Sequence, residues 1–322
     1  MPSSSPAREF KDLECLEAWR EGCYGASLVS SELHRREVLQ AAAAVGVAGV
    51  AEAAGGKKVA GRSVAPAFFV SHGSPMVALD SDAYPQALKS FADGLQEVRA
   101  LVVVSAHWET AGGVRVTASE APPLIYDFGG FPEPLYQLTY PCPGEPVLAR
   151  EVASRLVSAG FPAVEDPARG LDHGTWVPLR LALPAARLPV VQLSMPRGAT
   201  AEDVARMGEA LRPLRSQGVM LMGSGGITHN LRRVVFQDKY APAEPWAQAF
   251  DGWVAQGLSS RDFTGLRAWS TAPNARLAHP STEHLFPLYF VLGAALAEDR
   301  VTPVFEGFHH GTLSMRSFAL HS

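Results

Sequence analysis

The stretch Leu101-Val-Val-Val-Ser-Ala-His107-Trp108-Glu109 lies at the centre of the architecture that this sequence predicts. Its apolar, mostly β-branched residues 101–104 are typical of a short strand that is buried on both faces, and we expect this strand to stop at His107. In open α/β sheets, ligands bind outside the carboxyl ends of the strands, so histidines placed there can meet at one point. Two other apolar runs are also followed by a histidine: residues 67–70 by His72, and residues 219–222 by His229.

Composition limits the class of protein. The chain has 322 residues, of which 47% are hydrophobic and 19% charged, as in a globular protein with room for a large core. Lys and Arg number 28 against 32 for Asp and Glu, and no basic block stands out, so we expect no nucleic acid partner. The apolar run of residues 41–51 is too short to cross a bilayer, for which about 20 residues are needed. We therefore expect no membrane span.

The first part of the chain differs from the rest. Arg35-Arg36, the mild apolar run 41–51 and the ending Ala51-Glu-Ala53 together predict a twin-arginine export signal, and hence a periplasmic protein that begins near Ala54. The alternative is an Ala-rich amphipathic helix at the terminus of a cytoplasmic protein. We accordingly divide the chain into a leader, residues 1–63, and one domain, residues 64–322.

The domain alternates strand-like runs with amphipathic helices. This pattern predicts an α/β fold, a single domain with a central mixed, largely parallel sheet flanked by helices on both faces. A loop dense in Pro, Gly and aromatic residues is expected at 122–143, and a turn that carries His173 at 171–176. Strands are expected at 101–105, 114–118 and 190–193, from Val219, and near 301–306 and 312–320. Helices are expected at 84–95, 145–159, 201–214 and 244–257, and residues 279–284 should open a last long helix with Ser281 as its N-cap.

Half of the ten histidines occur at the predicted ends of elements. Taken singly, each of these histidines fits a structural, hydrogen-bonded role better than the role of a metal ligand. Their shared position at one edge of a sheet instead suggests a metal centre, because imidazole is a common ligand of iron and zinc. The five are His72, His107, His173, His229 and His284.

Six motifs carry a resemblance to a known family. They are similar to those of the DODA-type extradiol dioxygenases, within the class III, LigB-like ring-cleaving superfamily, and they cover residues 66–320. The motifs are Ser71-His-Gly-Ser-Pro75, Ser105-Ala-His-Trp108, Tyr126-Asp-Phe-Gly-Gly-Phe-Pro132, Leu171-Asp-His-Gly-Thr-Trp176, Gly223-Ser-Gly-Gly-Ile-Thr-His-Asn230 and His279-Pro-Ser-Thr-Glu-His284.

The resemblance implies a mononuclear metal, normally Fe(II) with Zn as the other possibility. It implies His72 and His107 as ligands, with His284 as the third ligand and the adjacent Glu283 as its competitor. His229 corresponds to the active-site base, and it can also approach the metal in some relatives. His173 fits a second acid/base histidine.

The implied reaction is the cleavage of a substituted catechol, DOPA-like or a phenylpropanoid, with O2 to a muconic semialdehyde. A facial set of three ligands leaves positions open for both catechol oxygens and for O2, and an imidazole is suited to remove a catechol proton near neutral pH. We expect Tyr126 and Trp176, and with them Trp108, to line an aromatic pocket, although packing alone would explain them. Asn230 is expected to bind substrate.

Other interpretations stay open at the level of sequence. Asp172 could fix the tautomer of a histidine or cap the following turn. Three histidines and a water also describe a zinc-dependent hydrolase, and a non-catalytic metal-binding or protein-binding relative is a third possibility. Adjacent His309 and His310, on a strand, would point to opposite faces, so at most one could face the site. The aromatic helix 244–257 could support a homodimer.

Overall fold

An eight-stranded mixed sheet forms the centre of the protein. The computed structural model describes residues 64–95 and 97–322, so the predicted leader, residues 1–63, lies outside the described residues. The strand order is β4-β3-β5-β2-β6-β1-β10-β7, and β8 pairs with β9 separately. The strands are β1 Ala67–Ser71, β2 Ala100–Thr110, β3 Val114–Thr117, β4 Ala163–Asp166, β5 Val190–Pro196, β6 Val219–Gly225, β7 Arg300–Phe305, β8 Phe308–His309, β9 Leu313–Ser314 and β10 Ser317–His321.

The four central strands β5, β2, β6 and β1 run parallel to one another. All seven residues of β6 and all five of β1 are buried, as expected for strands covered on both faces. Parallel strands present their carboxyl ends at the same edge. The predicted α/β class, with a mixed and largely parallel sheet, is therefore confirmed.

Alternate residues of these strands face two separate cores. In β1, Phe69 belongs to one core cluster and Phe68 to the other, and in β2 the same holds for Val102 and Val103. This alternation follows from the two-residue period of a strand. Each face then requires a helical layer to cover it.

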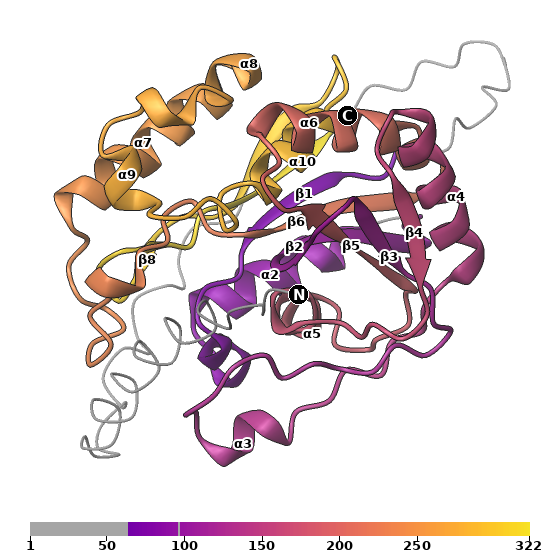
Figure 1. The fold of residues 1–322 in the computed structure, drawn as a ribbon. Helices are drawn as coiled ribbons and strands as arrows, with labels where there is room; N and C mark the ends of the chain where they lie inside the picture. Colours follow the sequence, from indigo (N-terminus) through magenta and orange to yellow (C-terminus); the bar gives the residue numbers. More distant parts are fainter. Residues whose placement is uncertain (1–63, 96) are drawn as a thin grey trace, which may run out of the picture.

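Helices supply both layers. Figure 1 shows α2 and α5 below the sheet and α6 and α10 above it. The α-helices are α2 Ala83–Asp93, α3 Glu133–Tyr136, α4 Pro146–Ser158, α5 His173–Ala182, α6 Ala201–Leu211, α7 Pro245–Ser259, α8 Phe263–Leu266, α9 Ala275–Ala278 and α10 Pro287–Gly293. The 3-10 helices of the described residues are η1 Pro75–Leu79, η2 Arg212–Gln217, η3 Leu231–Arg233 and η4 Trp269–Thr271.

The expectation that the strand stops at His107 is wrong. Strand β2 continues to Thr110, and its pairing with β5 shifts between Val104 and Glu109. Residues 105–108 therefore form an irregularity of the kind that re-aims side chains next to functional sites. His107 lies within this irregular part of a strand, not after it.

Two other expectations need correction. Residues 171–176 do not form only a turn, because His173 is already the first residue of α5. The last helix is short and begins at Pro287, so Ser281 is not its N-cap; the Ser281 hydroxyl instead donates to Glu283 Oε1 at 2.9 Å. Proline at the first helical position is a common helix start, since its missing N–H needs no partner there.

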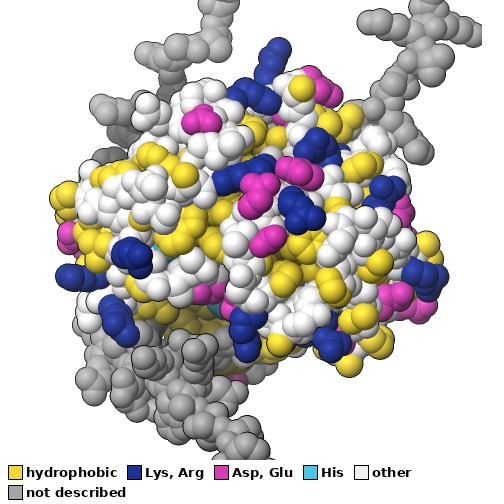
Figure 2. All heavy atoms as spheres, turned by 45° about the horizontal axis from the view of Figure 1, so that its top comes forward, with side chains coloured by type: hydrophobic (Ala, Val, Ile, Leu, Met, Phe, Trp, Pro, Cys, Tyr) yellow, Lys and Arg dark blue, Asp and Glu magenta, His cyan; other side chains and the backbone are white. Residues whose placement is uncertain are grey.

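On the face drawn in Figure 2, basic and acidic side chains alternate among hydrophobic ones, and only traces of histidine are visible. Within residues 64–95 and 97–322, no helix is both long enough and apolar enough to span a membrane.

A buried ion pair ties the two ends of the domain to the sheet. The side chains of Arg215 and Asp299 are both 0% exposed, and the guanidinium donates to Asp299 Oδ2 at 2.6 Å and to Oδ1 at 2.9 Å. It also donates to the carbonyl oxygens of Ala65, Ala294 and Leu320. All five N–H groups of the guanidinium are thereby used.

Replacing Arg215 with Met should lower the free energy of unfolding by about 3–5 kcal/mol, because it leaves the Asp299 carboxylate buried without its partner. Urea unfolding followed by circular dichroism measures this change. Arg150→Met, which removes an arginine whose side chain is 67% exposed, is the matched control and should cost no more than about 0.5 kcal/mol. Equal effects of the two substitutions would contradict the prediction.

Candidate metal centre

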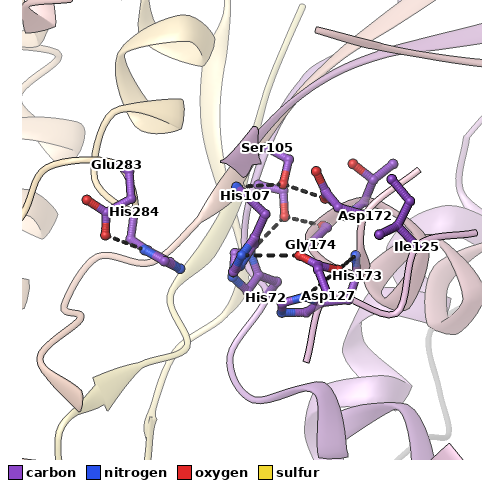
Figure 3. Close-up of polar contacts among 12 residues, drawn as sticks. His72, Ser105, His107, Ile125, Asp127, Asp172, His173, Gly174, Glu283 and His284 are labelled. Carbon is purple, nitrogen blue, oxygen red and sulfur yellow. Dashed lines mark hydrogen bonds and ion pairs between the residues drawn. The ribbon is translucent and has the colours of Figure 1, made fainter. Parts of the chain in front are cut away.

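Five histidines from five segments meet at the carboxyl edge of the central strands. His72 directly follows β1, His107 lies in the irregular part of β2, and His173 begins α5. His229 follows β6 by a short turn, and His284 lies in the turn before α10. The ring centroids of His72, His107 and His284 are 5.0, 5.3 and 5.0 Å apart, so the three rings surround a common point (Figure 3).

The hydrogen bonds of His72 define its tautomer. Its Nδ1 lies 2.9 Å from Ser224 Oγ, and that hydroxyl donates its own proton to the carbonyl oxygen of Gly174. A serine hydroxyl has a single proton, so Ser224 must accept from His72 and Nδ1 carries the hydrogen. Nε2 of His72 is then left with the free lone pair that a metal requires.

Asp127 orients two further histidines. Its Oδ2 lies 3.4 Å from Nδ1 of His107, while its Oδ1 lies 3.0 Å from Nδ1 of His173 and accepts the backbone N–H of His173 at 2.8 Å. A carboxylate only accepts, so both Nδ1 atoms are favoured as N–H donors. We assigned Asp127 no role from the sequence, although it lies within the motif at 126–132, between the aromatic residues Tyr126 and Phe128.

The spacing of the ring nitrogens fits one metal ion. His72 Nε2 and His107 Nε2 are 3.1 Å apart. Two imidazole nitrogens bound at about 2.1 Å to one ion, at a right angle, lie about 3.0 Å from each other. The chemistry of the donor set agrees, because neutral imidazoles whose other nitrogen is held by a hydroxyl or a carboxylate are typical ligands of iron and zinc.

Two groups of candidate ligands lie side by side. The possible ligand atoms of His72, His107 and His173 all lie within 4.8 Å of one another, and so do those of His229, Glu283 and His284. His284 Nδ1 lies 3.0 Å from Glu283 Oε1, which leaves the opposite nitrogen of His284 for the centre. His284 and Glu283 thus stand on the side of the centre opposite His173 (Figure 3). The choice of His284 as third ligand stays a prediction.

His229 stacks on His284, with ring centroids 3.4 Å apart and planes 5° from parallel. Burial, and then the charge that His284 can carry, lowers the pKa of His229 well below 6.5. The backbone N–H of His229 donates to the carbonyl oxygen of Ala278 at 3.0 Å, which holds the loop in place. A neutral imidazole that is held in position beside the centre can accept a proton.

The electrostatics favour neutral rings and ionised carboxylates. Burial, and then the neighbouring histidines, lowers the pKa of His72 and His107 well below 6.5. Burial by itself would raise the pKa of Asp127, but its contacts with His173 and His107 outweigh this and hold it well below the usual range. Glu283 behaves in the same way: its hydrogen bond with His284 brings its pKa to about 2 against the effect of burial. The neutral rings of His72, His107 and His229, together with the two carboxylates, suit a divalent cation.

Asp172 lies behind the centre and makes four contacts. Its side chain accepts from Thr175 N as the N-cap of α5, from Ser105 Oγ at 2.7 Å and from Gln192 Nε2, and Arg169 lies 3.6 Å away. Of the two roles that we expected for Asp172, capping is the one seen, and the carboxylate that lies beside the ring of His173 is that of Asp127, 3.0 Å from Nδ1. Burial, and then the charge of Asp127, raises the pKa of Asp172.

The three expected substrate-binding residues have their polar groups occupied by backbone. Tyr126 donates its hydroxyl proton to Leu138 O at 2.6 Å, and Trp176, which is fully buried, donates from Nε1 to Ile125 O at 3.1 Å. Asn230 donates from Nδ2 to Leu277 O at 2.7 Å. Their role in substrate binding stays a prediction. We did not single out Phe128, whose ring lies 5.5 Å from that of His173.

Three remaining expectations concern residues at the margin of the site. Trp108 packs under Arg169, whose guanidinium carbon lies 4.9 Å from the ring centroid. His309 contacts the rings of Tyr84 and Tyr240. His310 Nδ1 lies 3.2 Å from Val235 O and, with φ 54°, His310 is in a turn. The expectation that His309 and His310 are adjacent strand residues is therefore wrong, because only His309 belongs to β8.

A single α/β domain with this cluster at the carboxyl edge of its parallel strands defines a metal-dependent enzyme class. The family model described as the catalytic LigB subunit of aromatic ring-opening dioxygenase matches residues 66–315. The chain belongs to the LigB family, among its DODA-type members, and is an extradiol ring-opening dioxygenase that acts on a small molecule and O2 with the help of a metal.

Curated relatives agree with this placement. The chain is 39% identical over 264 residues to a 4,5-DOPA dioxygenase extradiol from Beta vulgaris, covering 79% of this chain and 96% of the relative. It is 40% identical over 256 residues to a protein of the same name from Escherichia coli (strain K12), covering 78% and 93%. A crystal structure of an uncharacterised protein from Escherichia coli K12 superposes with a TM-score of 0.68 at 35% identity, over 79% of this chain and 99% of that one.

Proposed function

We propose that this protein uses Fe(II) and O2 to cleave the ring of a substituted catechol, DOPA-like or a phenylpropanoid, to a muconic semialdehyde. The observation that carries the proposal is the pair of Nε2 atoms of His72 and His107, 3.1 Å apart, within a ring of five histidines. The names of the relatives, which include 4,5-DOPA dioxygenase extradiol, support the choice of substrate. Another relative, 32% identical, is a dioxygenase named tasH from Hapsidospora irregularis, whose name specifies no substrate.

The roles of the chain follow from its geometry. His72, His107 and His284 would hold the iron, which would supply the redox chemistry and open positions for the catechol oxygens and O2. His229 takes the proton of a catechol hydroxyl, since its ring is neutral and lies beside the centre. His173 has Asp127 Oδ1 3.0 Å from its Nδ1, and its ring lies in one group of possible ligand atoms with His72 and His107, where it can give or take a second proton.

Aromatic side chains form the wall next to His173. Phe128 contacts the rings of His173, Phe131 and Tyr136, and Tyr126 packs against Phe128 and Trp176. Tyr126, Phe128, Phe131 and Tyr136 come from the long segment that precedes α4, which Asp127 ties to the centre, whereas Trp176 comes from α5. A planar catechol is the kind of substrate that such a wall accommodates.

Anaerobic reconstitution tests the proposed chemistry. The apoprotein is loaded with Fe(II) or, separately, with Zn(II), and each form receives catechols and O2. We expect O2 uptake and a yellow semialdehyde with Fe(II) only. Hydrolysis of an ester or amide by the Zn(II) form, with no O2 uptake by either form, would favour the zinc hydrolase instead.

The ligand set leads to a prediction that separates His284 from His173. His284→Ala should lose most of its bound metal, whereas His173→Ala should keep the metal and lose turnover, because only the former removes a proposed ligand. Metal analysis after dialysis, together with the rate of O2 consumption, checks this. Metal loss in His173→Ala with retention in His284→Ala would move the third ligand to His173.

We further propose that residues 1–63 include a twin-arginine signal that sends the folded domain to the periplasm, with a cytoplasmic protein as the alternative. Arg35-Arg36 and the apolar run 41–51 support this proposal. N-terminal sequencing of protein recovered from the native cell envelope tests it. An intact Met1 in the soluble cytoplasmic fraction would reject it.

A further inference from the structure

We propose that a cavity next to the His229 loop binds a small organic carboxylate. The cavity has a volume of about 320 Å³ and is lined by Arg232, Arg233, Val234, Glu244, Trp246 and Leu277. None of the five histidines of the metal centre lines it. Its volume is at the lower end of the range of small-molecule sites in proteins.

The charges in the cavity favour an anion. Two arginines and one glutamate, all exposed, are among its lining residues, and across residues 64–95 and 97–322 neither Arg232 nor Arg233 forms an ion pair with an acidic side chain. Other arginines of the described residues do have acidic partners, as Arg267 has Glu202 and Glu209. Guanidinium groups bind carboxylates through two parallel hydrogen bonds, which a monovalent inorganic anion such as chloride cannot reproduce.

Trp246 points to an organic body for the ligand. Its indole is half-buried and packs against the core while also lining the cavity, so one side of the cavity is aromatic. Val234 and Leu277 add apolar surface. A carboxylate carried by a planar or aromatic group would satisfy the arginines and cover this surface at the same time.

The cavity shares its walls with the loop of the proposed base. Asn230 Nδ2 donates to the carbonyl oxygen of Leu277, and the N–H of His229 donates to that of Ala278. Asn230 Oδ1 in turn accepts the N–H of Arg232 at 3.2 Å. A ligand that rests on Arg232 and Leu277 therefore contacts both segments that hold His229 in place.

Isothermal titration of the metal-loaded full chain with phenylacetate tests the proposal, with 2-phenylethanol as the uncharged analogue and inorganic phosphate as the competing anion. We expect phenylacetate to bind and phenylethanol to bind at least about tenfold more weakly, because it lacks the charge. Equal binding of the two would overturn the proposal. Binding of phosphate more tightly than phenylacetate would overturn the assignment to a carboxylate.

Three variants locate the site. Arg232→Gln/Arg233→Gln should weaken phenylacetate binding by about tenfold or more, and Glu244→Gln should tighten it, since the repelling carboxylate is gone. Arg276→Gln removes the same charge from the neighbouring helix α9 at an exposed position outside the cavity, and should leave Kd within about twofold. A Kd that is unchanged in the double variant, or equally raised in Arg276→Gln, would place the binding elsewhere. A misfolded variant would bind phenylacetate more weakly, so the tighter binding expected for Glu244→Gln cannot arise from misfolding.

Discussion

Alanine in place of His229 should reduce kcat by roughly two to four orders of magnitude, the usual contribution of a positioned general base, while most of the metal stays bound. The reason is geometric: His229 lies face to face with His284 beside the centre, and burial keeps its imidazole neutral. Without it, the catechol must lose its proton to water. Steady-state rates of semialdehyde formation and metal analysis of the same sample check the two parts of the prediction.

His321→Ala is the matched control for this substitution. His321 ends β10, where its ring hydrogen-bonds to Thr302 at 2.7 Å, far along the sheet from the centre, so its loss should leave both kcat and metal content unchanged. Full turnover of His229→Ala would show that His229 is not the base. Loss of its metal would instead make His229 a ligand.

Gly174→Ala should weaken metal binding by roughly 10-fold to 100-fold, the range seen when the partners of metal ligands are disturbed. A Cβ at this position would lie 2.6 Å from Ser105 Oγ, 2.9 Å from His107 Cδ2 and 3.3 Å from His72 Nδ1. The contacts with Ser105 and His107 are too close for carbon, and the contact with His72 is tight, so the new methyl group would press on both histidines whose Nε2 atoms lie 3.1 Å apart. The Gly174 carbonyl also accepts the Ser224 hydroxyl that fixes the tautomer of His72.

Titration of the apoprotein with Fe(II) or Co(II) measures this loss, with thermal unfolding to confirm that the variant folds. Gly252→Ala is the control: Gly252 is within α7, a Cβ there would meet nothing within 4 Å, and alanine should stabilise the helix by about 0.5–1 kcal/mol without changing metal affinity. Unchanged metal affinity in Gly174→Ala would mean that His72 and His107 do not share the ion.

Much of the fold could be predicted because its signals are local. The β-branched run of residues 101–104 specifies a strand that is buried on both faces, and its alternate residues do face the two cores. The helix expected at 145–159 is found as α4, Pro146–Ser158, followed by Gly160 at φ 89°. Apolar periodicity and terminating residues suffice for elements of this kind.

Other features depend on contacts that the local sequence does not encode. The irregularity at residues 105–108 exists because β2 must pair with both β5 and β6 while its end turns His107 toward the centre. The sequence pattern did not predict the start of α5, because Pro178 lies inside the helix and interrupts the pattern that predicts a helix. We expected residues 279–284 to open the last helix. They instead lie before it, because Pro287 is the first residue of α10.

By itself, the sequence determined the order and type of most elements and the placement of five histidines near their ends, since periodicity, branching and breakers act over a few residues. Only the tertiary structure decided which ring nitrogen of each histidine faces the centre. That choice rests on contacts between residues far apart in the chain: the hydrogen bond of His72 with Ser224, 152 positions away, and the ion-pair contact of His173 with Asp127. Packing of the two helical layers on the sheet is what brings those partners within reach.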